Sequence, residues 1–291
     1  MRARLLVLLA ALLFSTAGAA IKACSLTAWQ VIAVRCALGV LVLLALLPET
    51  RVRWRASTIA VGAVYALQMI LFVSATKLTS AANAIFLQST APLYLLVLGP
   101  WILHEPVRRR DLLVMAALGI GLATILVGEV PQTAIAADPD LGNALAAATG
   151  LLWALTVTGI RWTARSAAGA GTALVAGNVV ACLACLPLAL PIRGATPADW
   201  GIVVFLGVVQ VGLAYVCLSV GMRDVPALET SLLMLIEPVL NPVWTWLVHG
   251  ERVGSASLAG GAIVLAATAA RAVADARRAP VAPPYRAEVD R

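Results

Sequence analysis

The sequence predicts an all-α integral membrane protein in which ten transmembrane helices form two inverted five-helix repeats. Three observations carry this prediction: the composition, the number of long apolar segments, and a similarity between the two halves of the chain. Of the 291 residues, 62% are hydrophobic and 12% are charged, and the mean hydropathy is +0.95. Soluble domains carry about 25% charged residues, so we expect this chain to lie in a lipid bilayer.

A helix that crosses the hydrocarbon core needs about 20 apolar residues. Charged or turn-rich breaks leave ten such segments, at residues 3–21, 27–47, 57–76, 79–102, 110–128, 142–163, 170–190, 199–220, 226–248 and 255–274. The first segment is also typical of a signal peptide, because it ends in Ala17-Gly18-Ala19 after a basic start and an apolar run. We interpret it as a retained span, since its removal would leave nine helices and destroy the repeat.

The basic residues predict the topology. Of the 21 Lys and Arg residues, Arg35 lies within a predicted span. Sixteen fall on one side of the membrane, and four fall on the other: Lys22, Lys77, Arg193 and Arg252. Such a bias marks the cytoplasmic side. Both termini are therefore expected in the cytoplasm, and the net charge of +7 is interpreted as a topology signal. The expected partner is the lipid bilayer and not nucleic acid.

The second half of the chain repeats the first with altered residues. Pro226–Arg252 falls on Ser80–Pro106 at an offset of 146 positions, and both copies keep the pattern Pro-x12-Glu, with Pro238 on Pro92 and Glu251 on Glu105. Five spans per half mean that the second copy enters the membrane upside down, an architecture typical of transporters. The expected units are residues 3–128 and 142–275, followed by a disordered cytoplasmic tail at 276–291.

Three ionisable residues, Arg35, Glu229 and Glu237, fall within predicted spans. Such groups are costly in lipid and indicate function unless they are paired. Glu237 is expected about midway along its span, next to Pro238, which removes a helix hydrogen bond and favours a kink. We assign coupling or gating to Glu237, Pro92 and Pro238. A structural role for Glu237 is the alternative, and we expect Arg35 to form an ion pair or cap and Glu229 to balance a helix dipole.

Polar and aromatic residues share faces on several predicted helices. At 100° per residue, Asn241 falls within 40° of Glu237. The deeper members of these faces predict a cavity for a ligand with an apolar body and polar ends, and we expect substrate contacts from Tyr65, Gln68, Tyr94, Trp153, Tyr215 and Asn241. The alternative is a belt of aromatic residues at the headgroups.

No P-loop, HExxH motif or nucleophile elbow occurs in the sequence, and its two histidines, His104 and His249, fall at predicted helix ends. An enzyme needs a denser catalytic set. We therefore expect no enzymatic activity, no metal and no cofactor, and we interpret Cys182-x-x-Cys185 as small packing residues.

Small residues are expected where helices touch. Gly119 and Gly121 in the fifth predicted span and Gly260 and Gly261 in the tenth would let backbones approach closely, which is how helices associate in lipid. The same residues are compatible with dimerisation, so the sequence leaves a monomer and a homodimer open.

The two halves with their Pro-x12-Glu patterns, Arg35 in the second span and the Glu237-Pro238 pair in the ninth resemble the EamA-type transporters of the drug/metabolite transporter superfamily. The resemblance covers residues 3–275. It implies a ten-helix exporter with cytoplasmic termini and a central cavity formed by spans 1, 3, 4, 6, 8 and 9. The bacterial members most similar in layout include exporters of amino acids, among them aromatic ones.

The expected function is a secondary transporter in the bacterial inner membrane that exports amino acids, aromatic or neutral ones above all, or related small metabolites by alternating access. Proton coupling and facilitated diffusion are both compatible with one deep carboxylate. The alternatives are a drug or metabolite exporter of another substrate class and a membrane sensor or assembly protein that transports nothing.

Overall fold

The computed structural model describes residues 2–51, 54–91, 93–94, 109–128, 136–164, 169–221, 225 and 233–276, and it is helical throughout most of them. The α-helices are α1 (Arg2–Ser15), α2 (Ala17–Ala23), α3 (Ala28–Leu46), α4 (Ala56–Leu78), α5 (Ala81–Gln88), α7 (Arg109–Val127), α8 (Pro139–Ala164), α9 (Gly169–Ala189), α10 (Pro197–Val204), α11 (Ala214–Gly221), α13 (Ile236–His249) and α14 (Ser255–Ala276). A 3-10 turn, η1 (Pro48–Arg51), follows α3, and a π-helix, η2 (Phe205–Leu213), joins α10 to α11.

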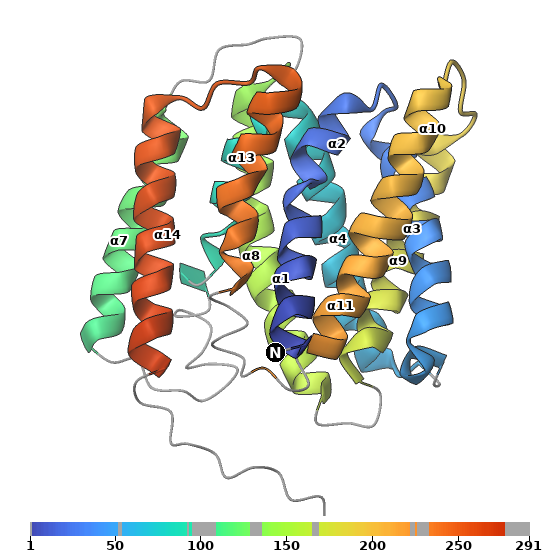
Figure 1. Ribbon diagram of the computed structural model, residues 1–291, viewed down its shortest axis with the longest axis horizontal. Coiled ribbons are helices and arrows are strands. Elements are labelled where there is room, and N and C mark those ends of the chain that lie inside the picture. The colour runs from blue at the N-terminus through green and yellow to red at the C-terminus, as the bar shows by residue number, and fades with distance from the viewer. Residues whose placement is uncertain are drawn as a thin grey trace, which may run out of the picture.

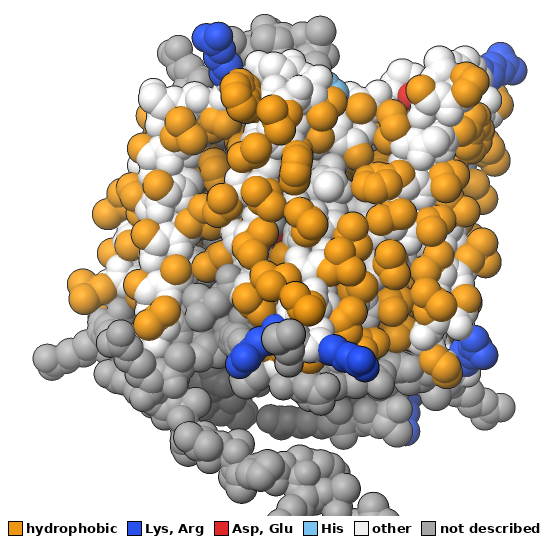
Figure 2. Space-filling model, viewed as in Figure 1, with side chains coloured by type: hydrophobic (Ala, Val, Ile, Leu, Met, Phe, Trp, Pro, Cys, Tyr) orange, Lys and Arg blue, Asp and Glu red, His pale blue; other side chains and the backbone are white. Residues whose placement is uncertain are grey.

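Five helical segments of the described part are long and apolar enough to cross a membrane: Arg2–Ala23, Ala28–Leu46, Ala56–Leu78, Gly171–Ala189 and Pro197–Gly221. Two shorter apolar helices, Leu112–Val127 and Ser255–Ala270, accompany them. Hydrophobic side chains cover the face in Figure 2 between two ends where Lys and Arg side chains gather. This distribution confirms a multi-pass membrane protein.

The helices stand side by side, and α1 begins at the end of the bundle where α14 finishes (Figure 1). α4 packs against both α8 and α9, α3 packs between α9 and η2, and α1 packs against α11 and α13. α7 and α14 form a pair at one edge. α1, α4, α5, α8, α11 and α13 thus lie together around the centre.

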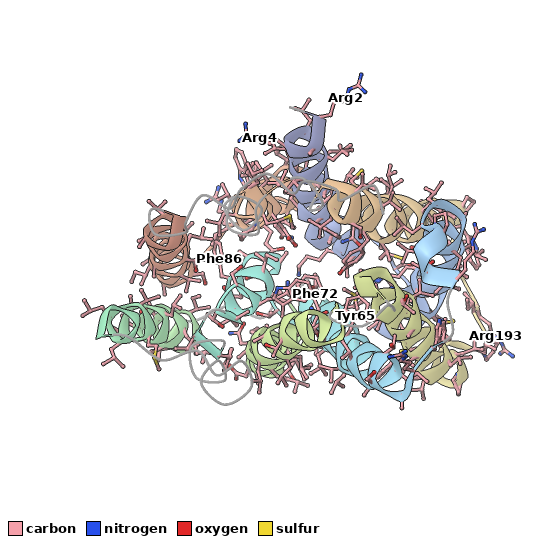
Figure 3. The ribbon with its side chains drawn as sticks, turned by 90° about the horizontal axis from the view of Figure 1, so that it is seen from below. Arg2, Arg4, Tyr65, Phe72, Phe86 and Arg193 are labelled. Carbon is pink, nitrogen blue, oxygen red and sulfur yellow. The ribbon has the colours of Figure 1, made fainter. Side chains whose placement is uncertain are left out.

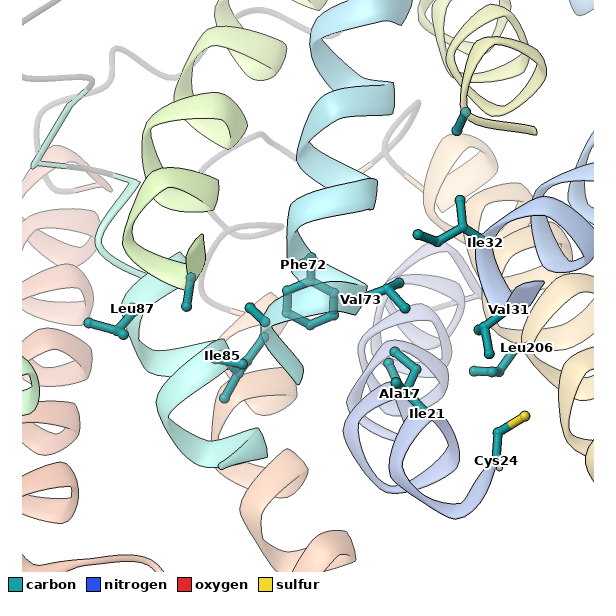
Figure 4. Packing of buried hydrophobic residues seen from close by; sticks show 14 of the residues in the cluster. Ala17, Ile21, Cys24, Val31, Ile32, Phe72, Val73, Ile85, Leu87 and Leu206 are labelled. Carbon is teal, nitrogen blue, oxygen red and sulfur yellow. The ribbon is translucent and has the colours of Figure 1, made fainter. Parts of the chain in front are cut away.

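A buried hydrophobic cluster lies near the end of the bundle opposite the N-terminus. Ala17 and Ile21 of α2 face Phe72 and Val73 of α4 and side chains of α3 and η2 (Figure 4). The Ala17-Gly18-Ala19 segment is buried in this core. An added Cβ at Gly18 would lie 2.5 Å from Asn241 Oδ1, so the close crossing of α2 and α13 requires glycine.

The other predicted packing glycines divide into two groups. A Cβ at Gly121 would lie 2.9 Å from the Gly260 carbonyl oxygen, and one at Gly260 would lie 2.6 Å from the Gly121 carbonyl oxygen. These two residues therefore hold α7 against α14. Gly119 has nothing within 4 Å of its added Cβ, and it contributes nothing to that contact.

Several predicted spans are interrupted. The first breaks at Thr16, where the Ser15 and Thr16 hydroxyls donate to the carbonyl oxygens of Leu12 and Leu13 at 2.7 Å each, a local bond that competes with the helix. The fourth turns at Ser89 and Thr90, ahead of Pro92, which lies outside the described residues.

The ninth span differs most from its prediction. A turn at Leu235 precedes α13, so Glu237 lies in the first turn of that helix and not midway along a continuous one. Pro238 is accommodated there because the first-turn N–H groups have no partner within the helix. Glu105, Glu229 and the predicted tail at 276–291, apart from Ala276, lie outside the described residues.

A layer of paired polar groups closes the end of the bundle opposite the N-terminus. The Lys22 ammonium lies 2.8 Å from the Thr79 carbonyl oxygen and 3.6 Å from Glu251 Oε2. The other oxygen of Glu251 accepts from the Ala81 N–H at 2.8 Å, at the start of α5. Glu251 therefore joins the end of α13 to α2 and α5, and its role is architectural.

Asp199 forms a second part of this layer. Its carboxylate accepts from the Ser25 N–H at 2.6 Å and from the Ser25 hydroxyl at 2.8 Å. It also accepts from the Thr196 N–H and hydroxyl at 2.9 and 2.7 Å, completing a capping box at the start of α10. Lys77 donates to the Cys24 carbonyl oxygen close by. Loops from both halves are thus tied together at one membrane surface.

Candidate functional site

Three aromatic rings meet in the middle of the bundle, each from a different helix. Tyr215 of α11 stands edge-on to Phe14 of α1, with ring centroids 4.8 Å apart, and edge-on to Tyr65 of α4 at 6.0 Å. All three are buried, and Trp153 of α8 packs against the same cluster while remaining partly accessible. Figure 3, which looks along the helices, shows Tyr65 well inside the bundle. The two halves of the chain therefore both contribute to one aromatic surface.

The rings are held by the close approach of α9. A Cβ at Gly177 would lie 2.4 Å from Tyr65 Cδ1, so the Tyr65 ring rests directly on the α9 backbone. The Tyr65 hydroxyl is buried and donates to no described group. A fixed ring with an unpaired hydroxyl can offer a hydrogen bond to a ligand.

Two charged side chains flank the rings. Glu237, at the start of α13, lies close enough to Tyr215 for its charge to act on the hydroxyl, and Arg35 of α3 acts on both Tyr65 and Tyr215. Glu237 keeps part of its surface accessible although protein surrounds it, whereas only 1% of Arg35 is exposed. An acid, a base and an aromatic surface are thus gathered within the apolar bundle.

Amide side chains extend the site along α4 and α5. Gln68, one turn after Tyr65, donates from Nε2 to Gln88 Oε1 at 2.7 Å, while its own Oε1 has no described partner. Tyr94, half-buried, approaches the backbone of α8 at Gly150. Both residues belong to the elements that surround the centre.

Asn241 lies on α13 where that helix crosses α2. Asn241 is buried, with only 1% of the residue exposed, yet neither its side-chain oxygen nor its side-chain nitrogen has a hydrogen-bond partner among the described residues. One turn later Trp244 donates from Nε1 to the Ser15 hydroxyl at 2.9 Å. The polar stripe predicted on the ninth span therefore faces α1 and α2.

Of the predicted substrate contacts, the structure brings Tyr65, Tyr215 and Trp153 into one cluster, with Glu237 beside it. Gln68 lies on α4 and Asn241 on α13, whereas Tyr94 follows the end of α5 and approaches α8 at Gly150. Pro238 is buried next to Glu237. Pro92 lies outside the described residues. The assignment of these residues to a substrate remains a prediction.

The sequence interpretation did not assign Phe14, Asn178 or Gln210 to the site, and it expected Arg35 to be paired. Oδ1 of Asn178 and Oε1 of Gln210 are buried without a described partner. Arg35 and Asn178 both act on the Tyr65 hydroxyl. Phe14 carried no signal beyond its apolar character.

The described residues contain no group of three or more His, Cys, Asp and Glu side chains that could hold a metal ion. The five cysteines are free, and Cys182 and Cys185 are spaced along one face of α9. The chemistry of the site is thus that of binding: aromatic contact, unpaired hydrogen-bonding groups and two opposite charges.

A multi-pass helical bundle with such a centre belongs to the class of membrane transporters built from two repeats. The sequence profile of the EamA-like transporter family matches residues 1–127 and again residues 140–270. The chain therefore belongs to the EamA-like transporter family, as the Pro-x12-Glu halves predicted.

Other comparisons agree with this fold. A solved structure titled "Crystal structure of protein" is similar with a TM-score of 0.64 and 22% sequence identity, over 96% of this chain and 99% of that one. At this identity the likeness concerns the fold alone. No curated protein matches the sequence.

Proposed function

We propose that this protein is a secondary transporter that exports amino acids, aromatic or neutral ones above all, or related small metabolites across the bacterial inner membrane. The observation that carries the proposal is the cluster of Phe14, Tyr65 and Tyr215, with Trp153 against it, in the centre of the bundle. A buried aromatic surface with unpaired polar groups suits a ligand that has an apolar body and polar ends.

We further propose ten spans in two inverted repeats, at residues 3–128 and 142–275, with both termini in the cytoplasm. The sixteen basic residues on one side support this orientation, as does the position of the start of α1 and the finish of α14 at one end of the bundle. The two halves would rock about the aromatic cluster, opening it to each side in turn. The protein would act as a monomer or a homodimer.

Glu237 is the proposed coupling group. Pro238, which is buried, and Pro92 would permit their helices to bend. The Glu237 carboxylate lies beside the aromatic cluster in a partly accessible position, where its protonation could accompany substrate movement. If it carries the proton, Glu237→Gln should abolish uptake driven by a pH gradient while leaving exchange at equal pH. Wild-type uptake that is the same with and without a gradient would eliminate coupling and leave facilitated diffusion.

The transport proposal is tested by uptake of labelled phenylalanine, tyrosine, tryptophan and leucine into proteoliposomes. We expect saturable uptake above that of protein-free vesicles. Tyr215→Ala should lower it by about tenfold or more, because the ring contacts both Phe14 and Tyr65 and a buried aromatic contact contributes on the order of 1.5 kcal/mol or more.

Trp246→Ala is the matched control. It also removes a large ring, but Trp246 is 56% exposed on the outside of the bundle, so uptake should be retained. Wild-type uptake equal to that of empty vesicles for all four compounds would reject amino acids as substrates. Equal losses in the two variants would reject the aromatic cluster as the binding site.

A further inference from the structure

Arg35 is a buried cation that forms no ion pair with any residue the structure describes. Only 1% of the residue is exposed, and Nε and Nη1 have no hydrogen-bond partner. The one hydrogen bond of its guanidinium in the described part of the chain runs from Nη2 to the Met69 sulfur at 2.7 Å. A thioether is a weak acceptor, so most of the donor capacity of this group is unused.

Burying a charge without a partner is strongly unfavourable, and stable proteins pair such a group with an acid. The carboxylates paired in the described residues, those of Glu251 and Asp199, are used at the end of the bundle. The Glu237 carboxylate also acts on Tyr215 but forms no ion pair with Arg35, so an anionic ligand could supply the missing partner.

The surroundings of Arg35 are those of a binding position. The charge acts on the hydroxyls of Tyr65 and Tyr215, and Tyr65 also lies near Asn178. The Tyr65 hydroxyl and Asn178 Oδ1 are buried and form no hydrogen bond within 3.5 Å, although the Tyr215 hydroxyl and Asn178 lie close to the Tyr65 hydroxyl. A tyrosine hydroxyl can donate to the same anion as a guanidinium, so the two groups together can hold both oxygens of a carboxylate.

The backbone next to Arg35 is also unusual. A Cβ at Gly207 would lie 2.8 Å from the Arg35 carbonyl oxygen, and Gly207 belongs to the π-helix η2. π-helical turns are rare and frequently occur at functional sites. The segment that covers Arg35 is thus the one with the least regular backbone of the described helices.

We propose that Arg35 and the Tyr65 hydroxyl bind the carboxylate of the transported substrate. The proposal rests on the function given above and narrows it: the substrate carries a carboxylate at one end, and its apolar body lies on Tyr65, Tyr215 and Phe14. Since Arg35 is enclosed in this conformation, the carboxylate reaches it when the helices around η2 separate during the transport cycle.

The test compares each amino acid with its amide, which has nearly the same shape and no negative charge. Binding of phenylalanine and phenylalaninamide, and of leucine and leucinamide, is measured by the thermal stabilisation of the purified full-length protein. We expect the wild type to bind the acid about 10- to 100-fold more tightly than the amide, the usual contribution of a hydrogen bond to a charged group. In Arg35→Gln this ratio should fall to about 1.

The ratio of the affinities for acid and amide distinguishes a binding role of Arg35 from a structural one. A structural Arg35 would weaken acid and amide equally on substitution and would lower the melting temperature of the free protein. We expect the melting temperature of free Arg35→Gln to equal or exceed that of the wild type, because an unpaired buried charge is removed. Arg35→Lys should keep a ratio above 1, and the exposed Arg193→Gln should keep the full ratio.

Three results would overturn the proposal: acid and amide binding equally to the wild type, a ratio that survives in Arg35→Gln, or stabilisation by chloride alone that is lost in that variant. The same binding measurement with benzoate and benzamide tests the carboxylate site independently of amino-acid transport, because neither compound is an amino acid. If no amino acid binds but benzoate binds in an Arg35-dependent way, the transport of amino acids is wrong and the carboxylate site stands. If no carboxylate binds, both are rejected.

Discussion

The end of the bundle and its centre use polar residues in opposite ways. At the end, Lys22, Glu251 and Asp199 are each bound to groups on other helices or loops. In the centre, the polar ends of Arg35, Tyr65 and Gln210 lie buried with donors or acceptors unused. At the end of the bundle, polar groups therefore join separate elements, although Glu251 Oε2 itself accepts no hydrogen bond. In the centre, several polar groups have no partner among the described residues.

This difference indicates that the polar layer at the end of the bundle stabilises the fold and that the central polar groups bind a ligand. Satisfied buried polar groups hold elements in one arrangement, whereas unsatisfied ones reduce stability unless a ligand completes them. We infer that the paired layer holds the elements at this end together, and that the central groups can accept hydrogen bonds or charge from a substrate. Substitutions at the two levels should consequently differ in what they damage.

The largest effect is expected for Glu251→Ala. The change removes the carboxylate that lies 3.6 Å from the Lys22 ammonium and the acceptor of the Ala81 N–H, and breaking a buried pair costs about 3 kcal/mol or more. Unfolding of the protein in mixed micelles should show this loss. The exposed neighbour Arg252, replaced by Ala, should lie within about 0.5 kcal/mol of the wild type; an equal loss there would mean that the paired layer is not what stabilises this end.

Asp199→Ala should have the next largest effect, about 2 kcal/mol, because it removes the capping box of α10 and both bonds to Ser25. The same unfolding measurement applies. Arg193→Ala, in the exposed loop before α10, serves as the control. A stability equal to that of the wild type would show that Asp199 is not part of the paired layer.

Trp244→Phe tests the hydrogen bond between α13 and α1, which lies between the paired layer at the end of the bundle and the unsatisfied centre. It removes only the hydrogen bond to the Ser15 hydroxyl and leaves a buried hydroxyl that still donates to the Leu12 carbonyl oxygen. We expect a loss of about 1 kcal/mol. Ser15→Ala should cost a similar amount, and the double variant should cost little more than either single change; additive losses would show that the two residues do not interact.

The smallest effect is expected for Gln210→Leu. Oε1 of Gln210 is buried and unpaired, so a side chain of similar size without that oxygen should leave the free energy of unfolding within about 0.5 kcal/mol of the wild type. A loss of 2 kcal/mol would contradict the view that the centre is unsatisfied.

Much of the fold was predictable from the sequence because it follows from hydropathy and length. The composition and the two Pro-x12-Glu patterns predicted a helical membrane protein of this family, and the family match confirms it. The packing role of Gly121 and Gly260 is also confirmed, since a Cβ at either would meet backbone of the other helix.

The interruptions were harder to predict. Ser15 and Thr16 divide the first span through bonds to their own helix, and hydropathy does not register such bonds. α13 begins at Ile236, later than the predicted start of the ninth span at residue 226, and this places Glu237 in a first turn. The apolar residues of the ninth segment had predicted one continuous helix.

The site was predictable as a set of residue types but not as a set of contacts. Tyr65, Tyr215 and Trp153 were expected to line a cavity and do form one cluster. Arg35 was expected to be paired, because most buried charges are, and only the structure revealed that Nε and Nη1 are unused. Pairing depends on which helices meet, and periodicity along one helix does not determine this.

The most direct test of this account compares Arg35→Gln and Glu251→Gln in one thermal unfolding experiment, with and without phenylalanine. We predict that Glu251→Gln lowers the melting temperature of the free protein and keeps the stabilisation by phenylalanine. Arg35→Gln should keep the melting temperature and lose the stabilisation. The opposite pattern, in which Arg35→Gln unfolds early and still responds to phenylalanine, would contradict the division between a paired layer and a binding centre.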